Sequence, residues 1–144
     1  MRIMAVDYGD VRTGIAVSDE SAKLAGEAWV LTEKDALAVA RAIAGEAVSR
    51  GVAAIVVGHP INMDGSAGPR AEKSERLAEA IRGLCGADVV LWDERMTTVS
   101  ANRILTETGR FGKKRKRTVD AVAASLILDS YLSFMARQSG NQQQ

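Results

Sequence analysis

An unbroken apolar run at residues 53–57 constrains the fold of this chain most strongly. It follows a segment of helical periodicity and ends in Gly58, His59 and Pro60. A strand with one solvated face alternates apolar and polar residues, whereas a strand covered on both faces is apolar throughout. We therefore expect residues 53–57 to form a central strand of an α/β fold, with helices on both faces of the sheet.

The segments around this run predict the rest of the sheet. Residues 2–6 and 13–17 are apolar runs on either side of a polar stretch and predict an antiparallel hairpin, and residues 27–31 predict a third strand. A further strand is predicted at 88–92, and helices are predicted at 35–50, 69–82, from Thr97 or Thr98 to 107, and 118–135. This order predicts a mixed five-stranded sheet, in which the first three strands are antiparallel and the last two parallel.

Length and composition indicate one globular domain. The 144 residues predict a single domain at 1–137, followed by a polar tail at 138–144 that we expect to be disordered. No stretch approaches the roughly 20 apolar residues that span a bilayer, and no secretory signal is visible, so we expect a cytoplasmic protein that does not act at a membrane. The single cysteine, Cys85, excludes an internal disulfide and is expected to be an inert, half-buried thiol.

Positive charge is concentrated in one segment, although the net charge is only +1. Five consecutive cations occur there: Lys113, Lys114, Arg115, Lys116 and Arg117. Because like charges repel one another, we predict a loop that stays mobile until a polyanion such as nucleic acid neutralises it. A merely solvated loop is the alternative.

Acidic residues occur where the predicted elements end or begin. Asp7 closes the first strand, and either Asp93 or Glu94 could act at the end of 88–92, since neighbouring strand residues point to opposite faces. Asp120 lies on the helix stripe expected to face the sheet, together with Ala123, Ala124, Ile127 and Tyr131. Asp7 could instead be a turn residue, and Asp120 could interact with a helix dipole.

Carboxylates that meet in a dehydrated cleft raise one another's pKa, and a divalent cation removes that cost. Oxygen ligands of this kind suit Mg²⁺ or Mn²⁺, which also bind phosphate oxygens. One or two such ions could support phosphodiester hydrolysis without a histidine base. The acids and the adjacent cationic run therefore favour a nuclease.

Four motifs in order resemble the YqgF family. They are AVDYG with RTGIAVS (5–9 and 12–18), GHPINMDGS (58–66), DERMTT (93–98), and VD with AA (119–120 and 123–124). The resemblance covers residues 2–132. It implies a ribonuclease H-like fold related to RuvC-type Holliday junction resolvases, with Asp7, Glu94 and Asp120 as the acidic positions. His59 departs from the aliphatic residue usual in that motif, and we expect it to be a strand-end side chain without a catalytic role.

The family resemblance implies two activities, maturation of the 5′ end of precursor 16S rRNA and resolution of Holliday junctions. The partner would be structured RNA or branched DNA, and the protein a monomer or, for a resolvase, a two-fold homodimer. Arg12, Arg70 and Arg95 are the candidates to position phosphates, with surface ion pairs as the alternative. A non-catalytic regulator that binds nucleic acid is the competing class of function.

The first motif also weakly resembles the phosphate loop of sugar kinases. Those enzymes need a second, equivalent domain, and 144 residues leave no room for it.

Overall fold

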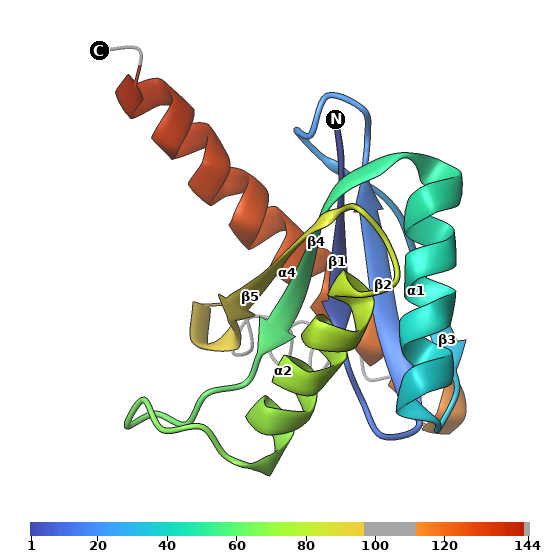
Figure 1. The fold of residues 1–144 in the computed structure, drawn as a ribbon. Helices are drawn as coiled ribbons and strands as arrows, with labels where there is room; N and C mark the ends of the chain where they lie inside the picture. Colours follow the sequence, from blue (N-terminus) through green and yellow to red (C-terminus); the bar gives the residue numbers. More distant parts are fainter. Residues whose placement is uncertain (97–111, 143–144) are drawn as a thin grey trace.

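The computed structural model describes the backbone of residues 1–96 and 112–142, with side chains described for 1–95 and 121–138. A five-stranded sheet is flanked by helices (Figure 1). The elements are β1 (Arg2–Asp7), β2 (Arg12–Ser18), β3 (Ala25–Thr32), α1 (Ala36–Arg50), β4 (Val52–His59), α2 (Pro69–Arg82), β5 (Asp88–Asp93), the 3₁₀ turn η1 (Glu94–Met96) and α4 (Gly112–Gln142).

The sheet has the strand order β3-β2-β1-β4-β5. β1 pairs antiparallel with β2, and β2 pairs antiparallel with β3. β4 pairs parallel with both β1 and β5, which places the apolar run 53–57 inside the sheet. The predicted mixed sheet, including its antiparallel start and parallel end, is confirmed.

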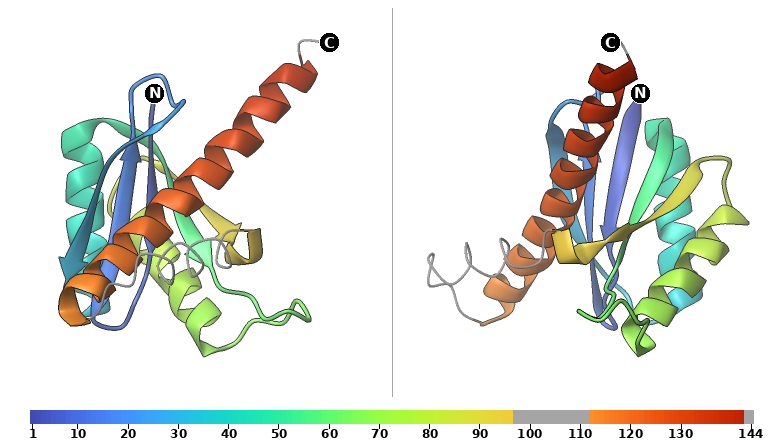
Figure 2. Two further views of the ribbon diagram at one scale, coloured as in Figure 1. Left: turned by 180° about the vertical axis from the view of Figure 1, so that it is seen from behind. Right: turned by 90° about the vertical axis from the view of Figure 1, so that its left-hand side faces the viewer.

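Helices cover both faces of the sheet, as predicted. α1 and α2 lie on one face and α4 crosses the other (Figure 2). Alternate residues of β1 enter two separate apolar cores: Met4 and Val6 pack on the α1 and α2 side, and Ile3 and Ala5 pack on the α4 side. This alternation places Asp7, the last residue of β1, on the face that α4 covers.

The ends of α1 follow ordinary capping chemistry. Asp35 precedes the helix, and its side chain accepts a hydrogen bond of 3.2 Å from the backbone N–H of Ala38. Gly51 closes the helix in the left-handed conformation, at φ 66°, where a residue without Cβ is favoured. The chain then enters β4 directly, which fixes the central strand beside β1.

Two predicted boundaries of the last helix are wrong. α4 begins at Gly112, so the basic run 113–117 lies in its first turns and not in a loop. Lysine and arginine are good helix formers, and repulsion between like charges on a helix costs only a few tenths of a kcal/mol per pair. At its other end α4 continues to Gln142, beyond the predicted end at 135 and into the segment 138–144.

The helix predicted from Thr97 or Thr98 to 107 lies outside the described residues. None of the described helices is long and apolar enough to cross a membrane.

Candidate active site

The carboxyl ends of β1, β4 and β5 meet at one edge of the sheet because these three strands run parallel. Asp7 is the last residue of β1, and Glu94 follows directly after the last residue of β5. Gly58 occupies the position between them, near the end of β4. Two of the three predicted acids, which are far apart in the chain, are therefore brought to the same edge.

The Asp7 and Glu94 side chains form a hydrogen-bonded carboxyl pair. The pKa of Asp7 is raised from 3.8 to about 8: burial is the largest cause, the neighbouring charge of Glu94 and the hydrogen bond between the two groups also raise it, and the positive charge of Arg70 lowers it. A hydrogen bond between two carboxyl groups requires a proton. The raised pKa of Asp7 keeps this proton in the pair at neutral pH.

Gly58 makes room for this pair. A Cβ atom at this position would overlap Oε1 of Glu94 and would lie 2.9 Å from Cδ1 of Ile127 on α4. The Glu94 carboxylate thus lies over the backbone of β4, between the sheet and α4. The predicted strand 53–57 stops short of Gly58, which hides the signal: a glycine inside a strand is a known sign of close approach by another group, and β4 extends to His59.

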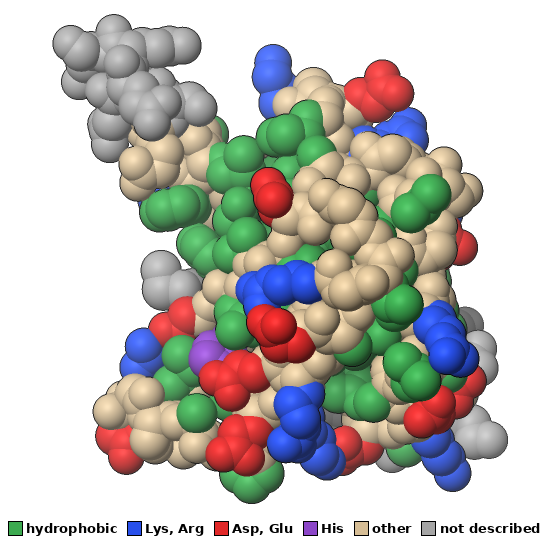
Figure 3. Space-filling model, in the orientation of Figure 1, with side chains coloured by type: hydrophobic (Ala, Val, Ile, Leu, Met, Phe, Trp, Pro, Cys, Tyr) green, Lys and Arg blue, Asp and Glu red, His purple; other side chains and the backbone are tan. Residues whose placement is uncertain are grey.

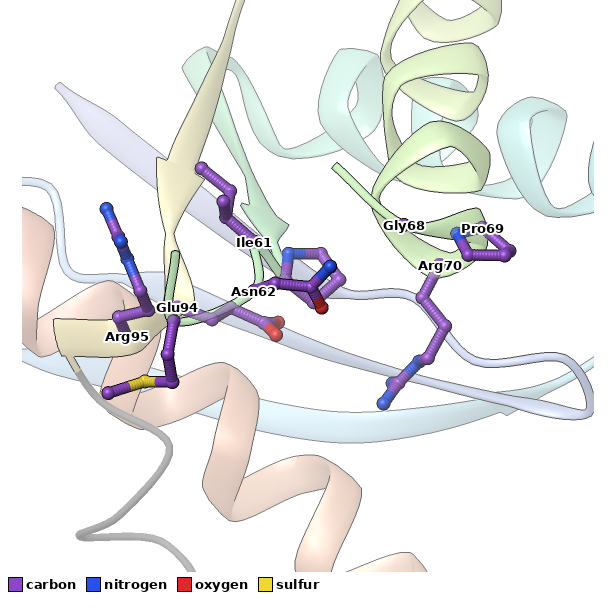
Figure 4. A pocket seen from close by; sticks show the side chains of 9 residues that line it. Ile61, Asn62, Gly68, Pro69, Arg70, Glu94 and Arg95 are labelled. Carbon is purple, nitrogen blue, oxygen red and sulfur yellow. The ribbon is translucent and has the colours of Figure 1, made fainter. Parts of the chain in front are cut away.

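Asp93 is directed into a different interaction. Its carboxylate accepts hydrogen bonds from the Arg95 guanidinium, with a distance of 2.6 Å from Nη2 to Oδ2, and these bonds lower the pKa of Asp93 below its ordinary value. Glu94, and not Asp93, is therefore the acid that the structure places beside Asp7. Arg95 points away from the Glu94 carboxylate (Figure 4).

A pocket of about 560 Å³ opens beside Glu94. Its walls are the 60–63 segment and the start of α2, and Arg70 extends into the same space (Figure 4). The loop after β4 is internally bonded: the backbone N–H of Asn62 donates to the carbonyl oxygen of Ser66 at 2.9 Å, and that of Ser66 donates to Asp64 at 2.9 Å. A ligand in this pocket would meet an acidic group and a guanidinium on opposite walls.

Comparison with known proteins identifies the family. A family model described as "RuvX: Holliday junction resolvase" matches residues 1–134. The chain belongs to this family. The resemblance to the YqgF family noted from the sequence motifs is thereby confirmed.

Two relatives of this RuvX family member share one name. A protein of Ruminiclostridium cellulolyticum named "Putative pre-16S rRNA nuclease" is 42% identical over 137 residues, which cover 94% of this chain and 96% of the relative. A protein of Geobacillus kaustophilus with the same name is 44% identical over 137 residues, covering 92% of this chain and 97% of the relative. The chain therefore spans nearly the whole length of these relatives.

Solved structures share the fold at low sequence identity. RuvC of Thermus thermophilus, in complex with a Holliday junction substrate, has a TM-score of 0.56 at 13% identity and covers 94% of this chain and 96% of its own. The fowlpox virus Holliday junction resolvase has a TM-score of 0.55 at 14% identity and covers 92% of this chain and 99% of its own. These likenesses confirm a RuvC-type, ribonuclease H-like fold for this RuvX family member.

Asp120 is carried by α4, but its side chain lies outside the described residues. Ala124 and Ile127, one and two helical turns further on, are buried against the sheet, and Ile127 approaches Gly58. The helix therefore passes the Asp7–Glu94 pair, and the place of the Asp120 carboxylate beside it stays a prediction. Among the residues whose side chains are described, no three of the acidic, histidine and cysteine side chains form a metal-binding group.

The other predicted site residues are spread around this edge. Arg12 is the first residue of β2, and Arg70 lies at the start of α2. His59 is held by α2: its Nε2 lies 3.1 Å from Oε1 of Glu75, and its side chain is only 15% exposed. The alternation of β4 places His59 on the face opposite Gly58, away from the acidic pair. The side chains of the basic run 113–117 lie outside the described residues.

Proposed function

We propose that this protein is a metal-dependent endonuclease that hydrolyses phosphodiester bonds, with Asp7, Glu94 and Asp120 as its acidic centre. The observation that carries the proposal is the Asp7–Glu94 pair, in which two carboxyl groups share one buried site and the pKa of Asp7 is raised to about 8. Such an arrangement is unfavourable unless a cation neutralises it, and perturbed acids of this kind are typical of catalytic sites.

The residues present fit a hard divalent cation such as Mg²⁺ or Mn²⁺. Carboxylate oxygens are the ligands these ions prefer, and Gly58 leaves space over the strand where the Glu94 carboxylate lies. Asp7, Glu94 and Asp120 would hold the metal. When bound, it would activate water and stabilise charge on the scissile phosphate.

The remaining residues would position the substrate. Arg70 faces the pocket beside Glu94, and a guanidinium can bind two phosphate oxygens at once. Arg12 would support the same phosphate region from the start of β2. The basic run 113–117 would bind phosphates of the nucleic acid at a greater distance from the cleaved bond. Arg95 is engaged by Asp93, so we expect it to contribute less than Arg70.

The substrate we favour is precursor 16S rRNA, processed at its 5′ end. The names of the relatives support this assignment, since the match covers nearly the full length of each. Resolution of Holliday junctions is the second candidate, supported by the description of the family model. A resolvase would have to act as a two-fold dimer, because it cuts two symmetric strands.

A cleavage assay tests the proposal. Purified protein is incubated with a precursor 16S rRNA fragment and with a four-way DNA junction, in Mg²⁺, in Mn²⁺ or in EDTA. We expect cleavage only with metal, and none by Asp7→Asn or Asp120→Asn. Asp88→Asn is the matched control. Asp88 is exposed at the opposite end of β5, so this variant should cleave like the wild type.

The preferred substrate distinguishes the two candidate functions, and gel filtration shows whether the active form is a dimer. Cleavage by Asp7→Asn at the wild-type rate would overturn the proposed centre. A wild-type protein that binds both substrates equally well with and without metal, and cuts neither, would instead be a non-catalytic regulator.

A further inference from the structure

Except for Arg82 in its last turn, the charged side chains of α2 fall on two flanks of the helix. Cations recur at every third residue along one flank: Arg70, Lys73 and Arg76. Acids occupy the other flank: Glu72, Glu75 and Glu79. All three cations are exposed. The helix is therefore nearly neutral as a whole, but it presents a continuous positive flank.

This positive flank borders a second hollow, separate from the pocket beside Glu94. The hollow has a volume of about 430 Å³ and lies between α2, the start of α1 and the turn that joins β1 to β2. Lys73, Arg76 and Lys34 line it, and its other lining residues are mostly apolar, among them Tyr8 and Leu77. In the space-filling view, cationic side chains lie over α2 at the lower centre of the molecule (Figure 3).

The acidic flank faces elsewhere. Glu75 contacts His59 at the end of β4, and Glu79 forms an ion pair with Arg82 of the same helix. Asp10 is the only acid among the residues that line the hollow; its Oδ1 lies 2.9 Å from Nζ of Lys73, and its side chain is 75% exposed. Exposed ion pairs contribute at most about 1 kcal/mol, so Lys73 remains available to another anion.

Cations of α2 line both pockets. Arg70 lines the pocket that contains Glu94, while Lys73 and Arg76, one and two turns further along the same helix, line the second hollow. From Arg70 to Arg76 the helix rises about 9 Å, which equals the axial rise of roughly three nucleotides in one strand of a duplex.

We infer that Lys34, Lys73 and Arg76 form a phosphate-binding track, which holds the backbone of the nucleic acid on the side of the active site opposite α4. The inference rests on the proposed function, and it extends the substrate contacts beyond Arg70. Three cations on an apolar floor match a sugar-phosphate backbone, which offers one anion per nucleotide and apolar sugar surface between the anions. Such a track reads the backbone and not the base sequence.

Binding of labelled nucleic acid tests the track. The double variant Lys73→Gln/Arg76→Gln is compared with Lys23→Gln/Arg137→Gln, which removes the same charge from exposed positions in the β2–β3 turn and in the C-terminal half of α4. Fluorescence anisotropy with an RNA hairpin and with a four-way DNA junction is measured in EDTA across a range of salt concentrations. EDTA prevents cleavage during the measurement.

We expect the track variant to raise Kd about tenfold at 0.1 M salt, and to lower the slope of log K against log salt by about 1.4 to 1.8, since each lost phosphate contact removes about 0.7 to 0.9. The control variant should keep the wild-type slope. A loss of affinity for either nucleic acid in the track variant supports the track. The nucleic acid whose Kd rises more is the one whose backbone the track holds.

The track would be overturned if the track variant kept the wild-type slope of log K against log salt, or if the control variant lost as much affinity as the track variant. If the wild type still cleaves with metal, the proposed function survives that result. A wild type that neither binds nor cleaves would overturn both.

Discussion

Replacement of Gly58 by alanine should disable the site with little effect on folding. The added Cβ would overlap Oε1 of Glu94 and lie 3.0 Å from its Cδ, whereas ordinary contacts begin at 3.4 Å. The carboxylate would have to move by about 1 Å, and a displacement of this size in a catalytic group costs roughly 100-fold in rate. Most of the adjustment falls on a flexible side chain and on Cδ1 of Ile127, so we expect a loss in unfolding free energy of only about 1 kcal/mol.

Two measurements check the Gly58→Ala variant. Metal-dependent cleavage at saturating substrate should fall about 100-fold, while thermal unfolding shifts by a few degrees. Carboxyl NMR should show the pKa of Asp7 falling, because the charge and hydrogen bond of Glu94 are withdrawn; it should stay above its ordinary value, because burial is the largest cause of the shift.

Gly45→Ala is the matched control for this experiment. Gly45 lies within α1, and an added Cβ there meets no atom within 4 Å. Alanine should stabilise the helix by about 0.5 to 1 kcal/mol and leave cleavage at the wild-type rate. If Gly58→Ala cleaves like Gly45→Ala and the pKa of Asp7 is unchanged, the Glu94 carboxylate does not act from the place described above.

Three further predictions concern stability, His59 and the basic run. Because the folded state raises the pKa of Asp7 from 3.8 to about 8, it holds a proton that the unfolded chain releases, and the wild type should lose stability as pH rises from about 4 to 8. In metal-free denaturation experiments Asp7→Asn should therefore be more stable than the wild type at pH 8, by a few kcal/mol at most, and equal to it near pH 4; no gain at pH 8 would contradict the raised pKa. His59→Leu removes the contact with Glu75 and no contact with the Asp7–Glu94 pair, so we expect cleavage within about threefold of the wild type, and a loss of 100-fold would reveal a catalytic role. Replacement of the five cations of 113–117 by glutamine should weaken nucleic-acid binding and reduce its salt dependence; an unchanged salt slope in titrations would show that the run does not contact phosphate.

Much of the fold can be predicted from local patterns in the sequence. The all-apolar run 53–57 indicates a strand covered on both faces, and the two runs before Ser18 indicate a hairpin, because side-chain alternation reports burial directly. The sequence also places Asp7 and the acids at 93–94 where predicted strands end, and the parallel pairing of β4 with β1 and β5 brings these ends to one edge. Charge repulsion within the basic run predicts a loop, but in α4 the helix propensity of lysine and arginine outweighs that repulsion.

The sequence by itself determined the strands, their succession along the chain and their antiparallel or parallel directions, because these depend on periodicity and on the segments that connect them. Only the tertiary structure decided that Glu94 rather than Asp93 pairs with Asp7, because Arg95 engages one acid and the bare backbone of Gly58 admits the other. The raised pKa of Asp7 and the two-sided charge pattern of α2 around its hollow were decided there as well. Electrostatic effects depend on distance and burial between residues remote in the chain, and neither quantity is encoded in local sequence.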